Sequence, residues 1–269
     1  MSTVQLQQGE HFGVTTARGE ARGVLLSCLR HAAARKLPRH VHEAAFFTML
    51  LRGGYRERAG SRAIDYDPLT VVFHPPSLAH FDEIAAGDSL LVTMEVAPRF
   101  MSECDLARPS LAPQPFASAR RLLALYRAAR GGVLQSLDIE SAAIELLASA
   151  AKTPEIAERA APPWLDRAIE LLREETNVRV ADLAREANVH PVHFARVFRR
   201  FLGVTPGAYL QRVRLQHALR LLGRAALAEV ALSAGFADQS HFCRAVRAHL
   251  GLTPRDVMAL LSERRRPGG

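Results

Sequence analysis

Hydrophobic positions in this chain follow two different periods, and the change of period separates a β-rich part from a helical part. Through residues 1–100, short runs of β-branched and other apolar residues alternate with turn residues. The predicted strands are Val24–Leu29, Phe46–Leu51, Leu69–Phe73 and Leu90–Val96. The predicted turns are residues 53–54, 65–68, 74–76 and 87–88, which are rich in Gly, Pro and Asp. Several short strands at this spacing predict a barrel or a sandwich.

Helical spacing replaces this pattern between Phe116 and Ala151. The first predicted apolar stripe consists of Leu122, Leu125, Tyr126 and Ala129. The second, beyond Gly131-Gly132, consists of Leu137, Ile144, Leu147 and Ala148. These helices have more apolar surface than a linker needs, and the sequence leaves open whether they cover the β domain or a second copy of the chain. A further short helix is predicted to begin at Thr153-Pro154, and Pro162-Pro163 ends the connection.

From Trp164 onward, one helix-turn-helix pattern occurs twice. In the second copy, a helix over Leu227–Ala234 is followed by Gly235 at a turn and by Asp238 as the cap of the next helix. Residues 194–206 and 242–254 match at a spacing of 48, with Phe, Arg, Leu, Gly, Thr and Pro at equivalent places. The first copy opens with a helix over Val180–Ala187. A single such pattern is a weak signal, but two in register are a strong one.

The two copies resemble the DNA-binding domain of the AraC family of bacterial transcriptional regulators. In the second copy the resemblance is carried by Ala231, Gly235-Phe236, Asp238, Ser240, Phe242, Arg244, Gly251 and Thr253-Pro254. In the first copy it is carried by Phe198-Arg199-Arg200, Gly203, Thr205-Pro206 and Tyr209. The match covers Trp164–Leu261, and it departs from the family at Val246 and Val257, where aromatic residues are usual. We expect both valines to occupy core positions.

This resemblance implies a transcriptional regulator with double-stranded DNA and RNA polymerase as partners. It also implies that the helices between Phe116 and Ala151 form a dimer contact, and hence a homodimer. The operator, the effector and the choice between activation and repression are left open by the sequence.

Base contacts are expected from the start of the second helix in each copy, which begins at His190-Pro191 in the first. Carried over position by position, the family motif implies base-facing residues at Val192, Ala195 and Arg196, and at Gln239, Ser240, Cys243 and Arg244. His193 is expected to face outward, and the predicted phosphate contacts are Arg199, Arg200 and Arg247. The alternative for each arginine is a salt bridge or backbone contact in its own domain, and for Val192 and Ala195 it is packing. A rigid helix over Gly207–Leu222 would place the copies in successive major grooves about 34 Å apart.

Charge is divided unequally along the chain. Residues 1–160 contain 18 Lys and Arg against 17 Asp and Glu, whereas residues 161–269 contain 17 against 10. A basic C-terminal part is expected of a protein that contacts phosphates there, although a solvated basic surface has the same composition. The closing run Arg264-Arg265-Arg266 is predicted to be a basic tail with little specificity.

Composition excludes several other classes of protein. Cys28, Cys104 and Cys243 form neither a disulfide framework nor a Cys-x-x-Cys metal pattern, so we expect free thiols. The N-terminus has no signal-peptide pattern, and no apolar run approaches the ~18 residues that span a bilayer. We therefore expect a cytoplasmic protein that does not bind membranes.

The β-rich part contains a second candidate site. His40-Val-His42 precedes a predicted strand, and alternate residues of a strand point to one side, so the two histidines are expected to share a face. With His80, they resemble the motif regions of the cupin barrel over Leu37–Phe81, in which histidines line the cavity. The glutamate of that motif is replaced by Phe46 or Phe47, and Glu43 would point away from His42.

These histidines are predicted to line an effector pocket, while metal binding by His40, His42 and His80 and a purely structural role are the alternatives. Further pocket candidates are Tyr55, Arg39 and Glu43.

The predicted fold class is α+β with three parts. They are a cupin-like β-barrel over 1–105, a linker with dimerisation helices over 106–162, and an all-α DNA-binding domain over 163–266. The function predicted from both resemblances is sequence-specific DNA binding controlled by a small-molecule effector in the barrel, with no catalytic residues and no required cofactor. The alternative is a cupin-type metal-dependent enzyme with a helical appendage.

Overall fold

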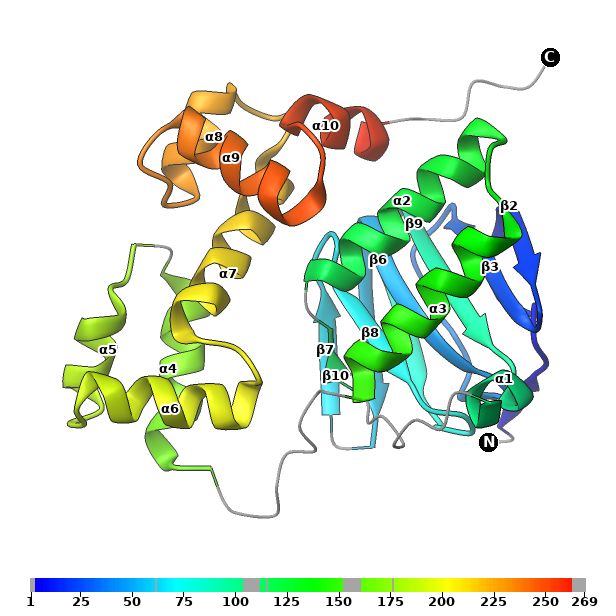
Figure 1. The fold of residues 1–269 in the computed structure, drawn as a ribbon, viewed down its shortest axis with the longest axis horizontal. Helices are drawn as coiled ribbons and strands as arrows, with labels where there is room; N and C mark the ends of the chain where they lie inside the picture. The colour runs from blue at the N-terminus through cyan, green and yellow to red at the C-terminus, as the bar shows by residue number, and fades with distance from the viewer. Residues whose placement is uncertain are drawn as a thin grey trace. The chain divides into compact units, whose positions relative to one another are not determined.

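The chain forms two units, Met1–Thr153 and Pro154–Gly269 (Figure 1). The structure is a computed structural model, and it describes residues 3–60, 62–103, 112–114, 116–151, 161–175 and 177–262. The first unit combines a sheet with helices and the second is helical, which confirms the predicted α+β class. The helix predicted at Thr153-Pro154 lies outside the described residues, as do Cys104 and residues 264–266. Among the described residues, no helix combines the length and apolar composition needed to cross a membrane.

An eight-stranded sheet forms most of the first unit. Its strands are β2 (Val14–Ala21), β3 (Val24–His31), β4 (Arg35–Lys36), β6 (Ala45–Ala59), β7 (Arg62–Tyr66), β8 (Val71–His74), β9 (Phe81–Val96) and β10 (Ala112–Pro113). Six of them run in the order β10-β8-β6-β9-β3-β2, while β4 pairs with β9 and β7 pairs with β6. A separate parallel pair joins β1 (Val4–Leu6) to β5 (His40–His42).

Two of the predicted turns are wrong, because their residues lie inside strands. β6 and β9 continue through residues 53–54 and 87–88 as strands of 15 and 16 residues. Their mutual register shifts between Leu50 and Tyr55, where Gly53 has a φ of +92°. A Cβ atom on Gly53 would lie 2.2 Å from Ser89 Oγ, so the glycine permits a close approach at a bulge. Glycine therefore marks a bend of two paired strands here and not a chain reversal.

A third predicted turn, residues 65–68, begins two residues late in the structure. Asp65 and Tyr66 still belong to β7, and the chain reverses where the Thr70 N–H donates to the Asp67 carbonyl at 2.9 Å. The strand β2 is absent from the predictions because its sequence, Val-Thr-Thr-Ala-Arg-Gly-Glu-Ala, has polar residues at half of its positions and no run of large apolar residues. Tertiary pairing with β3, which is almost entirely buried, makes it a strand.

Helices α2 (Phe116–Gly131) and α3 (Ser136–Ala151) cover one face of this sheet (Figure 1). This contact answers the question that the sequence left open about their apolar surface. The predicted stripe of α2 is confirmed for Leu122, Leu125 and Tyr126, which are buried, while its fourth member, Ala129, is half-buried. In α3 the prediction is wrong for Leu137 and Ile144, which are 75% and 51% exposed. The buried face of α3 consists of Ile139, Ala142, Ala143, Leu146, Leu147 and Ala150.

Small residues explain why α3 turns that face to the sheet. Alanines at 142, 143 and 150 permit close packing on the strands, whereas a stripe through Leu137 and Ile144 does not include them. Gly19 on β2 completes the fit, because a Cβ atom there would lie 2.4 Å from Leu134 Cδ2 and 3.1 Å from Ile139 Cδ1.

The second unit contains seven helices among its described residues. They are α4 (Pro163–Glu174), α5 (Val180–Glu186), α6 (Pro191–Leu202), α7 (Pro206–Leu221), α8 (Leu227–Ser233), α9 (Gln239–Leu250) and α10 (Pro254–Ser262). One core cluster, built around Leu172, Phe194 and Phe198, joins α4 to α7. Helix α7 also contacts α8 and α9, so it connects the two predicted helix-turn-helix copies. Val246 and Val257 are buried, as expected of core positions.

Candidate nucleic-acid interface and histidine cavity

The first candidate surface is the outward side of α6. The helix begins at Pro191, and His190 caps it because its Nδ1 accepts the N–H of Val192 at 3.3 Å. It ends at Gly203, which has a φ of +72° and serves as a left-handed cap. Phe194 and Phe198 are fully buried on the inner side. With both ends and one face fixed, the opposite face of α6 is held toward solvent.

Helix α9 repeats this construction. Asp238 Oδ1 accepts the N–H of His241 at 2.6 Å, and Gly251 ends the helix with a φ of +69°. On its inner side, Phe242, Val246 and Leu250 are all buried. Ahead of the helix, Gly235 has a φ of +80°, which confirms its predicted place in the turn.

The residues predicted to contact DNA lie on these two outward faces. Val192 is 59% exposed, so it has no core-packing role. Ala195 and Cys243 are half-buried at the edges of their faces. The remaining predicted contacts are exposed, namely His193, Arg196, Arg199, Arg200, Gln239, Ser240, Arg244 and Arg247.

Charge on these faces has one sign. Neither α6 nor α9 contains an acidic residue, while the partner helices α5 and α8 carry Asp182, Glu186 and Glu229. Within the described part of the chain, the arginines of α6 and α9 form no ion pair, which leaves their guanidinium groups available. On α7, Arg212 and Arg214 are half-buried, and burial lowers the pKa of Arg214. The second helix of each copy therefore carries positive charge with no acidic residue of its own.

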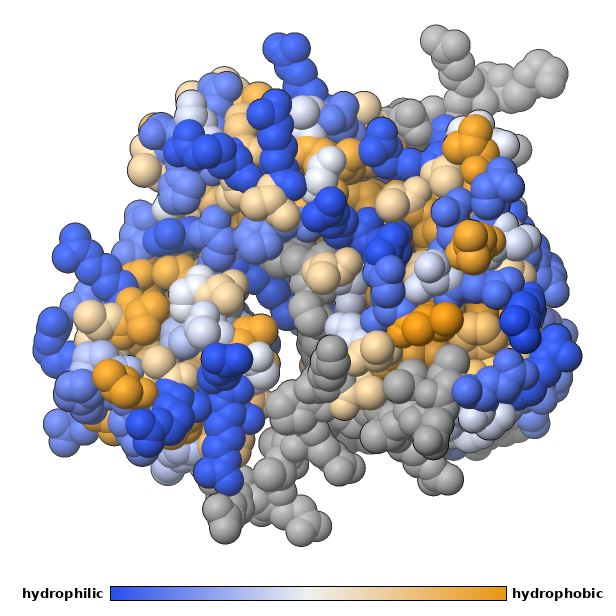
Figure 2. Space-filling model, viewed as in Figure 1, coloured by the Kyte–Doolittle hydropathy of each residue, from blue (hydrophilic) through white to orange (hydrophobic). Residues whose placement is uncertain are grey.

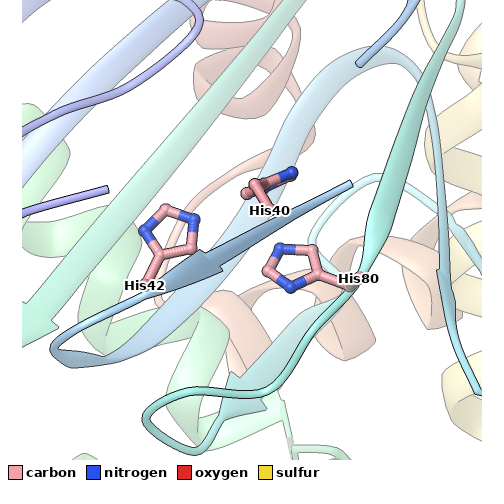
Figure 3. Close-up of side chains that lie close together, drawn as sticks. All are labelled: His40, His42 and His80. Atoms are coloured by element: carbon pink, nitrogen blue, oxygen red, sulfur yellow. The ribbon is translucent and has the colours of Figure 1, made fainter. Parts of the chain in front are cut away.

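A second site lies between strands of the first unit. His40 and His42 extend from β5, and His80 precedes β9 (Figure 3). One ligand nitrogen from each of these three buried histidines lies within 4.8 Å of the others. The backbones of His40 and His80 exchange two hydrogen bonds of 3.0 Å, which fixes the spacing of their rings. The predicted shared face of His40 and His42 is confirmed.

Backbone carbonyls orient two of these rings. His40 Nδ1 lies 2.9 Å from the Pro38 carbonyl oxygen, and His80 Nδ1 lies 2.9 Å from that of Leu78. Each Nδ1–H donates to its carbonyl, so Nε2 is the nitrogen that faces the cavity. Histidines that hold metal ions are commonly oriented in this way.

Sequence reasoning missed the carboxylate at this site. Asp82 Oδ2 lies 3.3 Å from His40 Nε2 and 4.0 Å from His80 Nε2, and the residue is 5% exposed. The available signal was the alternation along β9, where Phe81 and Glu83 face outward and Asp82 faces inward. The further pocket candidates Glu43 and Arg39 are both exposed and neither lines the cavity, so the prediction is wrong for these two residues.

A second buried carboxylate lies next to Asp82, since β6 and β9 pair Glu57 with it. His74 Nε2–H and the Tyr66 hydroxyl donate to Glu57 Oε2 at 2.6 and 2.7 Å. Tyr55, a predicted pocket residue, lines the cavity and hydrogen-bonds to Asp82.

Protonation at the site is divided between its members. Burial lowers the pKa of His42 to about 2 and also lowers the pKa of His80, so both rings are neutral. Burial also disfavours charge on His40 and Asp82, but their mutual hydrogen bond and attraction outweigh it. As a result the pKa of His40 is raised and that of Asp82 is lowered.

The cavity enclosed by these side chains has a volume of about 40 Å³. Sites for drug-sized organic ligands measure ~300–1,000 Å³, whereas ~10–15 Å³ accommodates one water molecule. The cavity therefore has room for an ion or a few waters and not for a larger organic effector.

Comparison with known proteins places the resemblance in the second unit. A family model described as "Helix-turn-helix domain" matches residues 183–259. The chain is 30% identical over 86 residues to an uncharacterized HTH-type transcriptional regulator of Haemophilus influenzae. The matched residues make up 31% of this chain and 29% of that protein. The chain is also 30% identical over 93 residues to the probable transcription factor PqrA of Proteus vulgaris, covering 34% of this chain and 74% of that protein.

A solved structure is also similar, that of a transcriptional regulator with an AraC-type DNA-binding domain from Chromobacterium violaceum. It is 28% identical, covers 39% of this chain and 96% of that one, and has a TM-score of 0.35. The chain spans 29–31% of the length of several curated relatives that it matches.

Proposed function

This chain belongs to the AraC family of helix-turn-helix transcriptional regulators, and on that basis we propose that it binds specific DNA sequences through α6 and α9. The observation that carries the proposal is the repetition of one outward surface. Both helices are capped at each end, bury aromatic residues on one side and present arginines on the other, and neither helix contains an acidic residue. A basic helix face of this kind suits the major groove of double-stranded DNA.

Equivalent positions in the two helices suggest a division of roles. Arg196 and Arg244 occupy matching places, and each can form a bidentate contact to guanine worth ~1–3 kcal/mol of discrimination. Arg199 and Arg247 also match and lie in the last turns, where phosphate contacts suit them better. Val192 and Ser240 match as well, but one offers a methyl contact to thymine and the other a hydroxyl. The two copies therefore read different bases.

Selection of bound sequences from a random DNA pool tests this proposal. A mobility-shift assay of the selected duplex and a scrambled duplex across a range of salt then measures the specificity ratio. We expect a complex with the selected duplex that survives moderate salt, and its loss when Arg196 and Arg244 are both changed to Gln. Arg167→Gln, an exposed change on α4, is the matched control and should bind normally. Equal binding to both duplexes, lost by moderate salt, would reject the proposal.

For the first unit we propose that the histidine cavity holds a divalent metal ion. His40, His42, His80 and Asp82 supply nitrogen and oxygen donors of the kind that Zn²⁺ and similar ions bind. Two of their polar atoms, His42 Nδ1 and Asp82 Oδ1, are buried without a hydrogen-bond partner among the described residues. Because the cavity leaves no space for an organic substrate beside an ion, we assign the chain no enzymatic activity, in preference to the cupin-type enzyme.

Metal analysis of the purified full chain tests this second proposal. We expect about one equivalent of metal by mass spectrometry of the digested protein, and its loss in His42→Ala. His241→Ala, which removes a half-buried histidine of α9 from outside the cavity, should keep the metal. Metal content that is unaffected by His42→Ala would contradict the site.

We also propose that the chain acts as a homodimer through α3. Apolar side chains remain exposed on α3 and just before it, namely Leu137 (75%), Ile144 (51%) and Val133 (64%). Figure 2 shows hydrophobic residues at the surface over α2 and α3. Sedimentation equilibrium should give a dimer for the wild-type chain and a monomer for Leu137→Lys. Leu232→Lys, which alters a residue of α8 with 60% exposure, is the control. A monomeric wild-type chain would contradict this part of the proposal.

As a cytoplasmic regulator, the dimer would bind a small-molecule effector and communicate with RNA polymerase at its promoters. An effector changes transcription only if it binds one arrangement of the protein better than another.

A further inference from the structure

We propose that a basic recess on the outer face of β4, β6 and β9 binds an organic anion that has an apolar, aromatic body. The recess has a volume of about 430 Å³, against about 40 Å³ for the histidine cavity. This volume falls in the usual range of ~300–1,000 Å³ for small-molecule sites. Its cationic lining residues are Lys36, Arg39, Arg56 and Arg58.

Strand register explains how cations from different strands meet here. Glu83 of β9 is paired with Lys36 of β4 on one side and with Arg56 of β6 on the other. Arg56 also donates to Asp65 through its Nε at 2.5 Å. This row of the outer face therefore carries acidic partners for its cations.

The next row lacks such partners. Arg58 is paired across the strands with Phe81 and, within the described part of the chain, forms no ion pair or hydrogen bond. Arg39 donates only to a neutral group, the hydroxyl of Thr3, at 2.7 Å. Neither of these two guanidinium groups is paired with a carboxylate of the protein. Both are therefore suited to bind a carboxylate or phosphate group of a ligand.

An apolar side chain among these cations narrows the ligand class. Phe81 is 44% exposed and lines the recess together with Leu37 and Ala79. A ligand with only an anionic group would leave this surface in contact with water. An aromatic body can stack on Phe81 while its acidic group reaches Arg58.

The recess adjoins the histidine cavity. Leu37 and Asp82 line both spaces, and Asp82 contacts His40 on the cavity side. A ligand in the recess would thus be separated from the proposed metal site by the side chain of Asp82. We infer that this ligand is the effector, and this last step rests on the proposed regulatory function.

Calorimetric titration of the full chain tests binding by itself. The probes are 3-phenylpropionate and phenyl phosphate, with 3-phenylpropanamide as the uncharged analogue and inorganic phosphate as the anion without an aromatic body. We expect saturable binding of both phenyl anions, at least about tenfold tighter than the amide or inorganic phosphate. Arg58→Gln should weaken the phenyl anions about tenfold, and Phe81→Ala should weaken them while leaving inorganic phosphate unchanged.

Arg127→Gln is the matched control, because Arg127 is an exposed cation on α2 outside the recess. Lys36→Gln provides a second variant, and thermal unfolding checks that each variant is folded. Equal affinity for 3-phenylpropionate and its amide, normal binding by Arg58→Gln, equal binding of phenyl phosphate and inorganic phosphate, or no binding of either phenyl anion in the millimolar range would each overturn the site.

Mobility shifts with and without the anion separate this inference from the proposed function. An anion that binds by calorimetry and changes the affinity of the chain for its selected duplex supports the effector role. Binding to the recess with unchanged DNA affinity would overturn the effector role alone. Lack of specific DNA binding in the absence of any anion contradicts the proposed function and leaves the calorimetric result standing.

Discussion

The two units place their functional side chains in opposite environments. The second unit presents arginines at the surface of α6 and α9, with aromatic residues buried behind them. The first unit buries its chemistry between strands, where His40, His80 and Asp82 are each at most 5% exposed. Functional side chains at the surface contribute little to the stability of the second unit. In the first unit, the functional side chains are themselves part of the core. Substitutions should therefore separate stability from binding in the second unit and mix them in the first.

The largest expected effect is on the buried side of a recognition helix. Phe242→Ala removes a fully buried ring from α9 and should lower the free energy of unfolding by about 3–5 kcal/mol. Arg244→Gln, two residues away on the exposed side, should change it by less than about 0.5 kcal/mol. Denaturant unfolding followed by circular dichroism measures both. Similar losses for the two variants would contradict the division of α9 into an inner and an outer face.

A smaller loss is expected from the buried carboxylate of the first unit. Glu57→Gln replaces the carboxylate oxygen to which both His74 and Tyr66 donate, so both buried donors lose a charged acceptor. We expect a loss of about 1–3 kcal/mol in the free energy of unfolding. Glu20→Gln, an exposed change on β2, is the control and should have almost no effect. If Glu57→Gln unfolds like wild type, the inward chemistry of this unit does not support its core.

The two units also differ in how much of their structure the sequence predicted. In the second unit, caps and breaks such as Asp238, Gly235 and Gly251 act within a few residues, so local patterns located both helices and their outward faces. In the first unit, Asp82 meets His40 only through strand pairing, and no local pattern in the sequence connects them. The bulge at Gly53 was predicted as a turn, because glycine has the same local pattern at a turn and at a bend of two paired strands. Only the long-range pairing distinguishes the two.

Base contacts provide the next test of the outward surface. Arg196→Gln should weaken binding to the selected duplex by about 1–3 kcal/mol and relax the sequence preference at one position. Its free energy of unfolding should stay within about 0.5 kcal/mol of wild type, because the side chain is exposed. Competition binding with single-base variants of the duplex measures this. Uniform weakening across all duplexes would instead place Arg196 on a phosphate.

The smallest expected effect concerns the arginines in the last turns of the two helices. Arg199→Gln and Arg247→Gln change matching positions that are proposed to contact phosphates, so each should weaken every duplex alike. Each lost phosphate contact lowers the magnitude of the slope of log K against log salt concentration by about 0.9. Because the positions are equivalent, the two variants should show the same change in slope and the double variant about twice that change. A change at one position only would show that the two helices contact the backbone differently, despite their shared construction.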